Sequence, residues 1–262
     1  MNIKKRLSIF FVMFLFLLEL AAGAFSKTQK FDISSVADID VKLMFENLTV
    51  STWEGNQIVI ISEASKKDIL PLVTCENMTL QIASTYPINK SFDEKSFCEI
   101  SLMLPKNYVA EKASIKERYN KLEIKKLDAK TVIITPGSEN ILSNITADYF
   151  EIPLPDETDL NISNLDCNSF NITLIVGDAN ISLSRPPVKA SKLSVKEGKL
   201  KLSIPDASSF TVHADSYHSR FINNYDGSVT DWVRDGITYK HNGGGSEINI
   251  KTFKGDITIR SE

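Results

Sequence analysis

Apolar residues in the middle third of the chain recur with a period close to 20 residues. Short apolar anchors begin at Leu122, Ile141, Leu160, Ile181 and Leu200, so successive anchors lie 19, 19, 21 and 19 residues apart. A second apolar pair falls about halfway through each unit: Val132/Ile134, Phe150/Ile152, Phe170/Ile172, Leu193/Val195 and Phe210/Val212. A unit with two short strands cannot bury its own apolar stripe. Each unit must therefore pack on its neighbours.

The rest of the chain beyond its first residues consists mainly of short alternating runs. Asp38 to Leu43, Gln57 to Ile61 and Glu99 to Pro105 alternate apolar with polar residues and are bounded by Asn, Asp, Gly or Pro. Alternation at period two is typical of strands with one buried face. Two stretches, 64–73 and 109–126, have some helical character, but the first contains a proline and the second lacks a sustained apolar stripe. We therefore predict an all-β chain.

The regular period favours a single-stranded parallel β-helix, or solenoid, in which each unit forms one coil about 4.8 Å from the next. The alternative is a β-sandwich, whose strands recur every 8–12 residues or so. We prefer the solenoid because the unit length is nearly constant and the repeats lack Asn-Gly hairpin turns. It predicts two internal columns of side chains, Phe150–Phe170–Leu193–Phe210 and Ile141–Leu160–Ile181–Leu200.

The open ends of a solenoid are strand edges, which must be covered to prevent polymerisation. We expect residues 25–118 to form an N-terminal β region that caps one end with less regular, partly antiparallel strands. Residues 119–262 would hold the solenoid repeats and a C-terminal cap over 232–262, with aromatic residues such as Trp232 and Tyr239. The whole of 25–262 is expected to be one continuous domain.

The first 24 residues have the three parts of a secretory signal peptide. Lys4, Lys5 and Arg6 precede an apolar run over 9–18, and Ala22 and Ala24 form a small-x-small cleavage site. We predict cleavage after Ala24, so that the mature chain begins at Phe25. No later stretch is long and apolar enough to span a bilayer. The predicted location is therefore extracytoplasmic: periplasm, cell surface or secreted.

Charge and cysteine content narrow the possible partners and chemistry. The formal net charge of −3 provides no basic field, so we do not expect nucleic acid as a partner. Cys75, Cys98 and Cys167 have neither CxxC nor Cys/His spacing, which disfavours zinc and redox sites. An oxidising compartment permits a Cys75–Cys98 disulfide. Whether it forms is left open.

Several strand motifs, taken in order, resemble the bacterial "putative adhesin" family of β-strand-repeat proteins, an exported domain of unknown function. The motifs are Phe31-Asp-Ile33, Ile39-Asp-Val41, Leu48-Thr-Val50, Ile100 to Pro105, Leu202 to Ala207, and the tail from His241 to Arg260. The chain differs in its middle, where Pro136-Gly137 and Gly177-Asp178 replace the family's usual Ser-Gly or Asn-Gly turns. The resemblance implies an extracytoplasmic β-helical fold and no established reaction.

Few residues point to chemistry. His213 and Asp215 are two apart on a predicted strand, so they share a face and present two metal-ligand types, whereas His218 would face the other way. The sequence places no third ligand, and we interpret the segment as a polar outward face. We assign no catalytic, cofactor-binding or metal-binding residue and expect no cofactor.

These observations favour a non-enzymatic exported cell-envelope protein that acts as an adhesin-like binding or structural module. Its expected partners are envelope or surface proteins or polysaccharides, and its oligomeric state is open. Two alternatives remain. One is a polysaccharide-active β-helix enzyme, which needs a pair of converging carboxylates. The other is an accessory or sensor protein of envelope stress.

Overall fold

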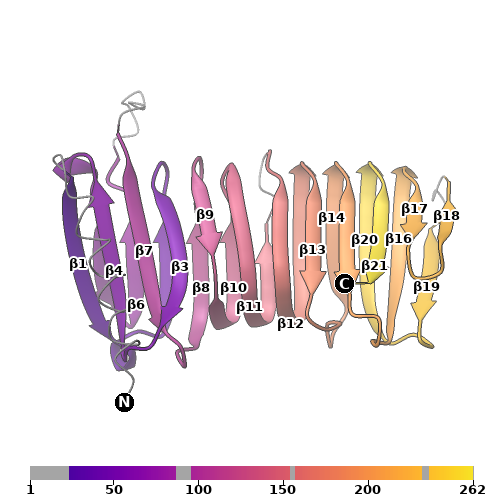
Figure 1. Ribbon diagram of the computed structural model, residues 1–262, viewed down its shortest axis with the longest axis horizontal. Coiled ribbons are helices and arrows are strands. Elements are labelled where there is room, and N and C mark those ends of the chain that lie inside the picture. The colour runs from indigo at the N-terminus through magenta and orange to yellow at the C-terminus, as the bar shows by residue number, and fades with distance from the viewer. Residues whose placement is uncertain (1–23, 87–95, 154–156, 232–235, 262) are drawn as a thin grey trace, which may run out of the picture.

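Strands stand side by side along the longest axis of the molecule in a computed structural model that describes residues 24–86, 96–153, 157–231 and 236–261 (Figure 1). The predicted signal peptide lies outside these residues, except for Ala24. Within them the regular structure is β, apart from two single-turn 3-10 helices at Ile33–Ser35 and Lys67–Ile69. The predicted all-β class is confirmed. No described helix has the length and apolarity needed to cross a bilayer.

Backbone hydrogen bonds join the strands into two long rows that share two long strands, β11 (Glu139–Ile152) and β12 (Leu160–Val176). The first row runs in this order: β5 (Leu72–Glu76), β6 (Thr79–Ala83), β2 (Asp38–Lys42), β8 (Ala110–Lys116), β10 (Leu127–Thr135), the second halves of β11 and β12, β14 (Ser191–Glu197), β20 (Ser246–Lys254), β16 (Phe210–His218) and β19 (Ile237–His241).

The second row contains the strands that alternate with these along the chain. Its order is β1 (Phe25–Asp32), β4 (Gln57–Ala64), β7 (Cys98–Pro105), β3 (Asn47–Trp53), β9 (Lys121–Ile124), the first halves of β11 and β12, β13 (Ala179–Leu183), β15 (Leu200–Ile204), β21 (Ile257–Ser261), β17 (Phe221–Asn223) and β18 (Ser228–Thr230). Inward side chains of both rows form one hydrophobic core, so the two rows lie face to face.

Neighbouring strands within the repeats are parallel, with a register step near the period of the sequence. Phe150 lies opposite Phe170, and Ile152 lies opposite Ile172. The Phe150 and Phe170 side chains are fully or almost fully buried. Each repeat therefore covers the apolar stripe of the next, as the 20-residue period predicts.

The remainder of the predicted first column is wrong. Leu193 pairs with Ile172, two residues beyond Phe170 along the strand. Phe170 instead donates its backbone N–H to the Ser191 hydroxyl, at 3.1 Å. Phe210 is not next to β14, because β20 lies between them. The buried Ser191 takes the inward position next to Phe170, so the apolar pair Leu193/Val195 lies opposite Ile172 and Leu174.

The predicted second column needs a similar correction. Ile141 is 51% exposed, whereas Leu142 is buried and pairs with Ile162. Ile181 continues the column of Ile162, so it lies in a different column from Leu160. Ile141 faces outward because moving one residue along a strand turns the side chain to the opposite face, whereas Ile181 lies two residues beyond the partner of Leu160, Ala179, on the same face. Asn140 takes the inward position and donates to the Asp159 carbonyl at 2.6 Å.

Near both ends of the molecule, one coil of the chain inserts out of sequence order. β20 and β21 pair on one side with β14 and β15 and on the other with β16 and β17. At the opposite end, β2 and β3 lie between the β6–β7 pair and the β8–β9 pair. Most of the predicted C-terminal cap over 232–262 is therefore an internal part of the row.

Antiparallel strands close the two ends. At the N-terminal end β1 pairs with β4, β4 with β7, and β5 with β6, all antiparallel. At the other end β18 and β19 pair antiparallel with β17 and β16 (Figure 1). Tyr239 belongs to this cap, and Trp232 lies outside the described residues.

Glycines stack where the chain turns from the first row to the second. Gly177, Gly198 and Gly255 have φ angles of 134°, 146° and 131°. A Cβ on Gly198 would lie 2.0 Å from the carbonyl oxygen of Gly177, and a Cβ on Gly255 would lie 2.0 Å from that of Gly198. The coils can approach at this corner only because these residues have no side chain.

The three cysteines are free thiols in the structure. Cys75 is partly buried on β5 and donates to the Ser35 carbonyl at 3.4 Å, whereas Cys98 and Cys167 are buried. Burial raises the pKa of the Cys98 and Cys167 thiols to about 12. The disulfide that the sequence left open is absent from this structure.

Candidate functional site

Outward side chains of the central repeats bond mainly to one another. Asn171 donates to the Glu151 carboxylate at 3.3 Å, and Asn168 donates to that of Asp148 at 2.8 Å. At the bend of the same strands Asn164 donates to the Asn144 carbonyl oxygen at 2.6 Å. Each pair joins equivalent positions of two successive repeats. The polar groups of this face are largely occupied by their own neighbours.

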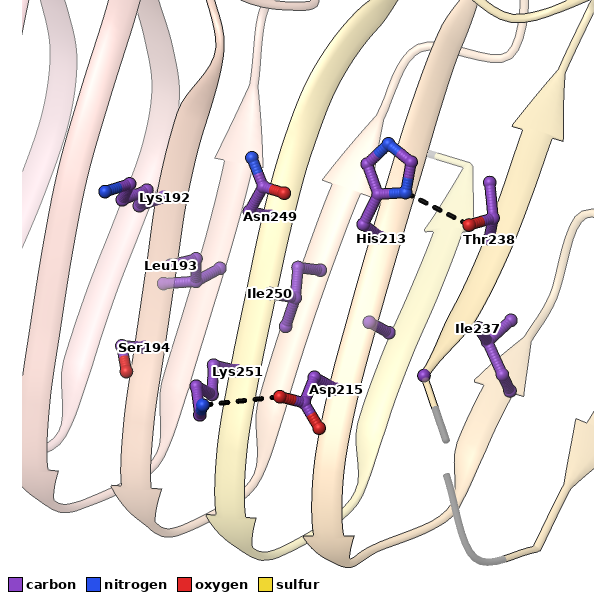
Figure 2. A pocket seen from close by; sticks show the side chains of 12 residues that line it. Lys192, Leu193, Ser194, His213, Asp215, Ile237, Thr238, Asn249, Ile250 and Lys251 are labelled. Carbon is purple, nitrogen blue, oxygen red and sulfur yellow. Dashed lines mark hydrogen bonds and ion pairs between the residues drawn. The ribbon is translucent and has the colours of Figure 1, made fainter. Parts of the chain in front are cut away.

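A shallow groove of about 580 Å³ crosses the outward face of β14, β20, β16 and β19, and we call it the C-terminal groove (Figure 2). One line of side chains across it consists of Lys192, Asn249, His213 and Thr238, each on a different strand and in register with the next. A second line consists of Ser194, Lys251 and Asp215. The strand pairing alone therefore brings these residues together.

Two contacts within the groove organise its side chains. The Lys251 ammonium lies 3.3 Å from an Asp215 carboxylate oxygen, and His213 Nδ1 lies 3.0 Å from the Thr238 hydroxyl (Figure 2). Lys192 and Asn249 make no side-chain hydrogen bond or ion pair with any other described residue. Their hydrogen-bonding groups face solvent and are available to a ligand.

An aromatic pair lies beside the groove. Tyr217 on β16 and Phe253 on β20 stack with ring centroids 5.6 Å apart and ring planes 9° apart, and each is 49% exposed. These rings, with Lys196 and Ser194 of β14, border a second hollow of about 380 Å³ that shares Lys251 and Asp215 with the first. Half-exposed aromatic rings in a hollow offer a flat apolar contact surface.

The residues singled out in the sequence meet at this face without forming a metal site. His213 and Asp215 do point to the same side, but Thr238 and Lys251 are their respective partners. The His218 ring packs edge-on against Tyr217, with centroids 4.8 Å apart. No three His, Cys, Asp or Glu side chains are grouped to hold a metal ion within the described part of the chain.

Sequence reasoning missed Asn249, Lys251 and Phe253 as members of a common surface with His213 and Asp215. They reach it because β20 inserts beside β16, pairing His213 with a residue 36 positions later in the chain. The alternating tail indicates that β20 is a strand. It contains no local signal for the neighbours that the strand will have.

A buried carboxyl group lies at the corner between β8 and β9, away from the groove. Glu117 is fully buried, and one of its oxygens accepts the backbone N–H groups of Tyr119 and Asn120 at 3.0 and 2.7 Å. Its other oxygen has no hydrogen-bond partner among the described residues. Burial raises the pKa of Glu117 to about 7, and the nearby Glu46 acts in the same direction.

The fold and the groove together define an all-β strand-repeat protein with a polar, partly aromatic outer face. No protein-family model and no curated protein sequence matches the chain. Several solved structures are similar to it, and some of them are described as a "putative adhesin" or a "putative cell adhesion protein". The sequence motifs resemble the family of the same name.

Three of the similar structures, which differ in their descriptions, illustrate the similarity. A "putative lipid binding protein" from Parabacteroides distasonis is 12% identical, with a TM-score of 0.49 over 90% of this chain and 96% of that one. A "putative adhesin" from Bacteroides fragilis is 11% identical, with a TM-score of 0.45 over 90% and 97%. A "putative cell adhesion protein" from Clostridium sporogenes is 13% identical, with a TM-score of 0.41 over 91% and 100%.

Proposed function

We propose that this protein is a non-enzymatic, exported binding module of the cell envelope that holds an extended polymer in the C-terminal groove. We further propose that each repeat is one coil of a β-helix, with the groove on its flat side. The observation that carries the proposal is the alignment of unpaired polar groups with an exposed aromatic pair on three adjacent strands.

The groove is well suited to binding because its strands are held on both sides. β14 pairs with β12 and β20, β20 with β14 and β16, and β16 with β20 and β19. Strands with two partners fix the spacing of their outward side chains, so little conformational entropy is lost when a ligand binds. An extended ligand would therefore meet a preformed array.

The same pairing argues against a peptide that binds as an added strand. Strand addition needs a free edge with unpaired N–H and C=O groups. The three strands at the centre of the groove have none, because both edges of each are occupied. A ligand must bind through the side chains, which favours a polymer with its own hydroxyl or charged groups.

Two features support export. Residues 1–24 have the composition of a secretory signal, and strand β1 begins at Phe25, next to the predicted cleavage site. Fractionation of cells that produce the tagged full-length chain should place it outside the cytoplasm. N-terminal sequencing of that fraction should begin at Phe25, and an intact Met1 would contradict the prediction.

Binding is tested by sedimenting purified 25–262 with protease-treated cell-wall polymer. Wild type should sediment, and the double variant Tyr217→Ala/Phe253→Ala should stay in the supernatant. Tyr119→Ala is the matched control, since Tyr119 is 45% exposed and lies outside the groove. If wild type stays in solution, or if the double variant sediments equally well, the proposal is wrong.

A further inference from the structure

We infer that the C-terminal groove binds an anionic glycan, a polysaccharide that carries carboxylate groups. This inference rests on the proposed binding function and gives it a ligand class. In this arrangement a sugar ring packs against the Phe253–Tyr217 pair, and lysines bind the carboxylates of that sugar and its neighbours.

The aromatic pair supplies the contact that a sugar ring requires. A pyranose ring has C–H groups on its faces and hydroxyl groups round its edge, so it packs against a flat apolar surface and hydrogen-bonds sideways. The Phe253 and Tyr217 rings border the hollow. Ser194 and Asp215 lie at its edge within reach of sugar hydroxyls.

The charge of the groove selects an acidic sugar. Three lysines, Lys192, Lys196 and Lys251, line the two hollows together with a single carboxylate, that of Asp215. Lys192 and Lys196 make no ion pair with any described residue, and only Lys251 contacts Asp215. The chain as a whole has a net charge of −3, so this local excess of positive charge is a property of the groove.

The spacing of the lysines fits a ligand with repeated charges. Lys192 and Lys196 lie on the same outward side of β14 with Ser194 between them. A strand rises about 3.3 Å per residue, so their Cα atoms lie roughly 13 Å apart along the strand. Lys251 is in register with Ser194 on the neighbouring strand, between the two along the strand direction. Along the strand direction, the three lysines therefore follow one another at intervals of about 7 Å.

Single-stranded nucleic acid also binds through basic side chains and stacked aromatic rings. It is less suited to this groove because the two rings stack on each other and so offer one contact surface, where a strand of nucleic acid stacks its successive bases on several. A DNA arm in the experiment separates the two ligand classes.

Isothermal titration calorimetry of purified 25–262 tests the inference with oligosaccharides of polygalacturonate. The matched ligand is the same oligosaccharide with its carboxylates methyl-esterified, and a third arm uses single-stranded DNA of similar length. Acidic oligosaccharide should bind at least about tenfold more tightly than its ester, the size expected for a lost charge-assisted hydrogen bond. DNA should not compete with it.

Variants locate the binding. Lys192→Ala/Lys196→Ala should weaken acidic-oligosaccharide binding by about tenfold or more, while Lys201→Ala, on β15 in the second row, should leave it unchanged. All these lysines are on outward positions, and equal thermal midpoints will show that folding is intact. Equal affinity for acid and ester, tighter binding of DNA, or no binding of the acidic oligosaccharide overturns the inference.

Two further outcomes distinguish failure of this inference from failure of the proposed function. If the ester binds as well as the acid and the Tyr217→Ala/Phe253→Ala variant binds neither, the groove is a glycan site without a preference for charge. If the lysine and aromatic variants bind the acid as wild type does, the site lies elsewhere and the proposed function fails with the inference.

Discussion

The outward faces of the central repeats and of the C-terminal groove differ in how their polar side chains are paired. In β11 and β12, equivalent positions of successive repeats carry residues that bond to each other, such as Asn171 with Glu151. In the groove, β20 separates two strands that would otherwise be neighbours and places unlike residues in register, such as Lys192 with Asn249. Regular order lets successive repeats bond to each other through their polar groups, and the change in order places Lys192 and Asn249 side by side without a bond to any described residue.

The largest effect is expected from removing β20 and β21, the strands that create the difference between the two faces. A chain ending at Gly245 lacks β20 and β21, so the inward faces of β16 and β17 lose the neighbours that cover them. We expect the region from β16 to β19 to unfold while β10 to β12 stay folded. Hydrogen exchange should show lost protection confined to the C-terminal strands. Unchanged protection of β16 would show that β20 is dispensable.

The central column is tested by Phe170→Ala. Phe170 is almost fully buried opposite Phe150, so the change should lower the free energy of unfolding by about 3–5 kcal/mol. Asn171→Ala, on the outward side of the same strand, removes one hydrogen bond and should cost about 1 kcal/mol or less. Urea unfolding of both variants measures the two values. Equal losses would contradict the assigned faces of β12.

Glu117 should make stability fall as pH rises. Burial raises its pKa from an ordinary 4.5 to about 7 in the folded chain, so the folded state binds a proton more tightly than the unfolded state. The contribution is complete below pH 4.5 and is lost as pH approaches 7, with a change of about 3 kcal/mol at most. Glu117→Gln should remove this slope in urea unfolding measured from pH 4 to pH 8.

The same experiment also compares two parts of the corner where the chain turns from the first row to the second. Towards the C-terminus the corner carries glycines at 177, 198 and 255, which have nothing to titrate, whereas in the coil of β8 and β9 a buried carboxyl group takes this place. A pH slope that survives Glu117→Gln would show that it does not come from this carboxyl group.

The smallest effect is expected from a hydrogen bond between two serine hydroxyls of successive repeats. Ser163 donates to Ser143 at 2.9 Å at an exposed position. Ser163→Ala should change the free energy of unfolding by about 0.5 kcal/mol or less, as is usual for surface substitutions. A loss above about 1.5 kcal/mol would show that the polar ladders are a main source of stability in the central repeats.

The sequence predicts the strands and the spacing of the repeats, because both depend on local patterns of apolar and polar residues. Phe150 and Phe170 pair as the period predicts, since no insertion separates their strands from the rest of the repeat. It placed Phe210 beside Leu193 wrongly, because the neighbour of β14 is a strand from the end of the chain. The groove escaped prediction for the same reason. In the sequence, its residues are outward residues of separate strands, and only the order of the strands shows that they lie side by side.

The inserted C-terminal coil also determines when the fold can be completed. Ser191 lies opposite Ile248, so the outer edge of β14 remains unpaired until a segment 57 residues later is available. A chain that leaves the ribosome or a translocation channel from its N-terminus cannot close this gap until β20 and β21, residues 246–261, have emerged. These two strands therefore insert between strands that were made before them, and the groove forms only when they do.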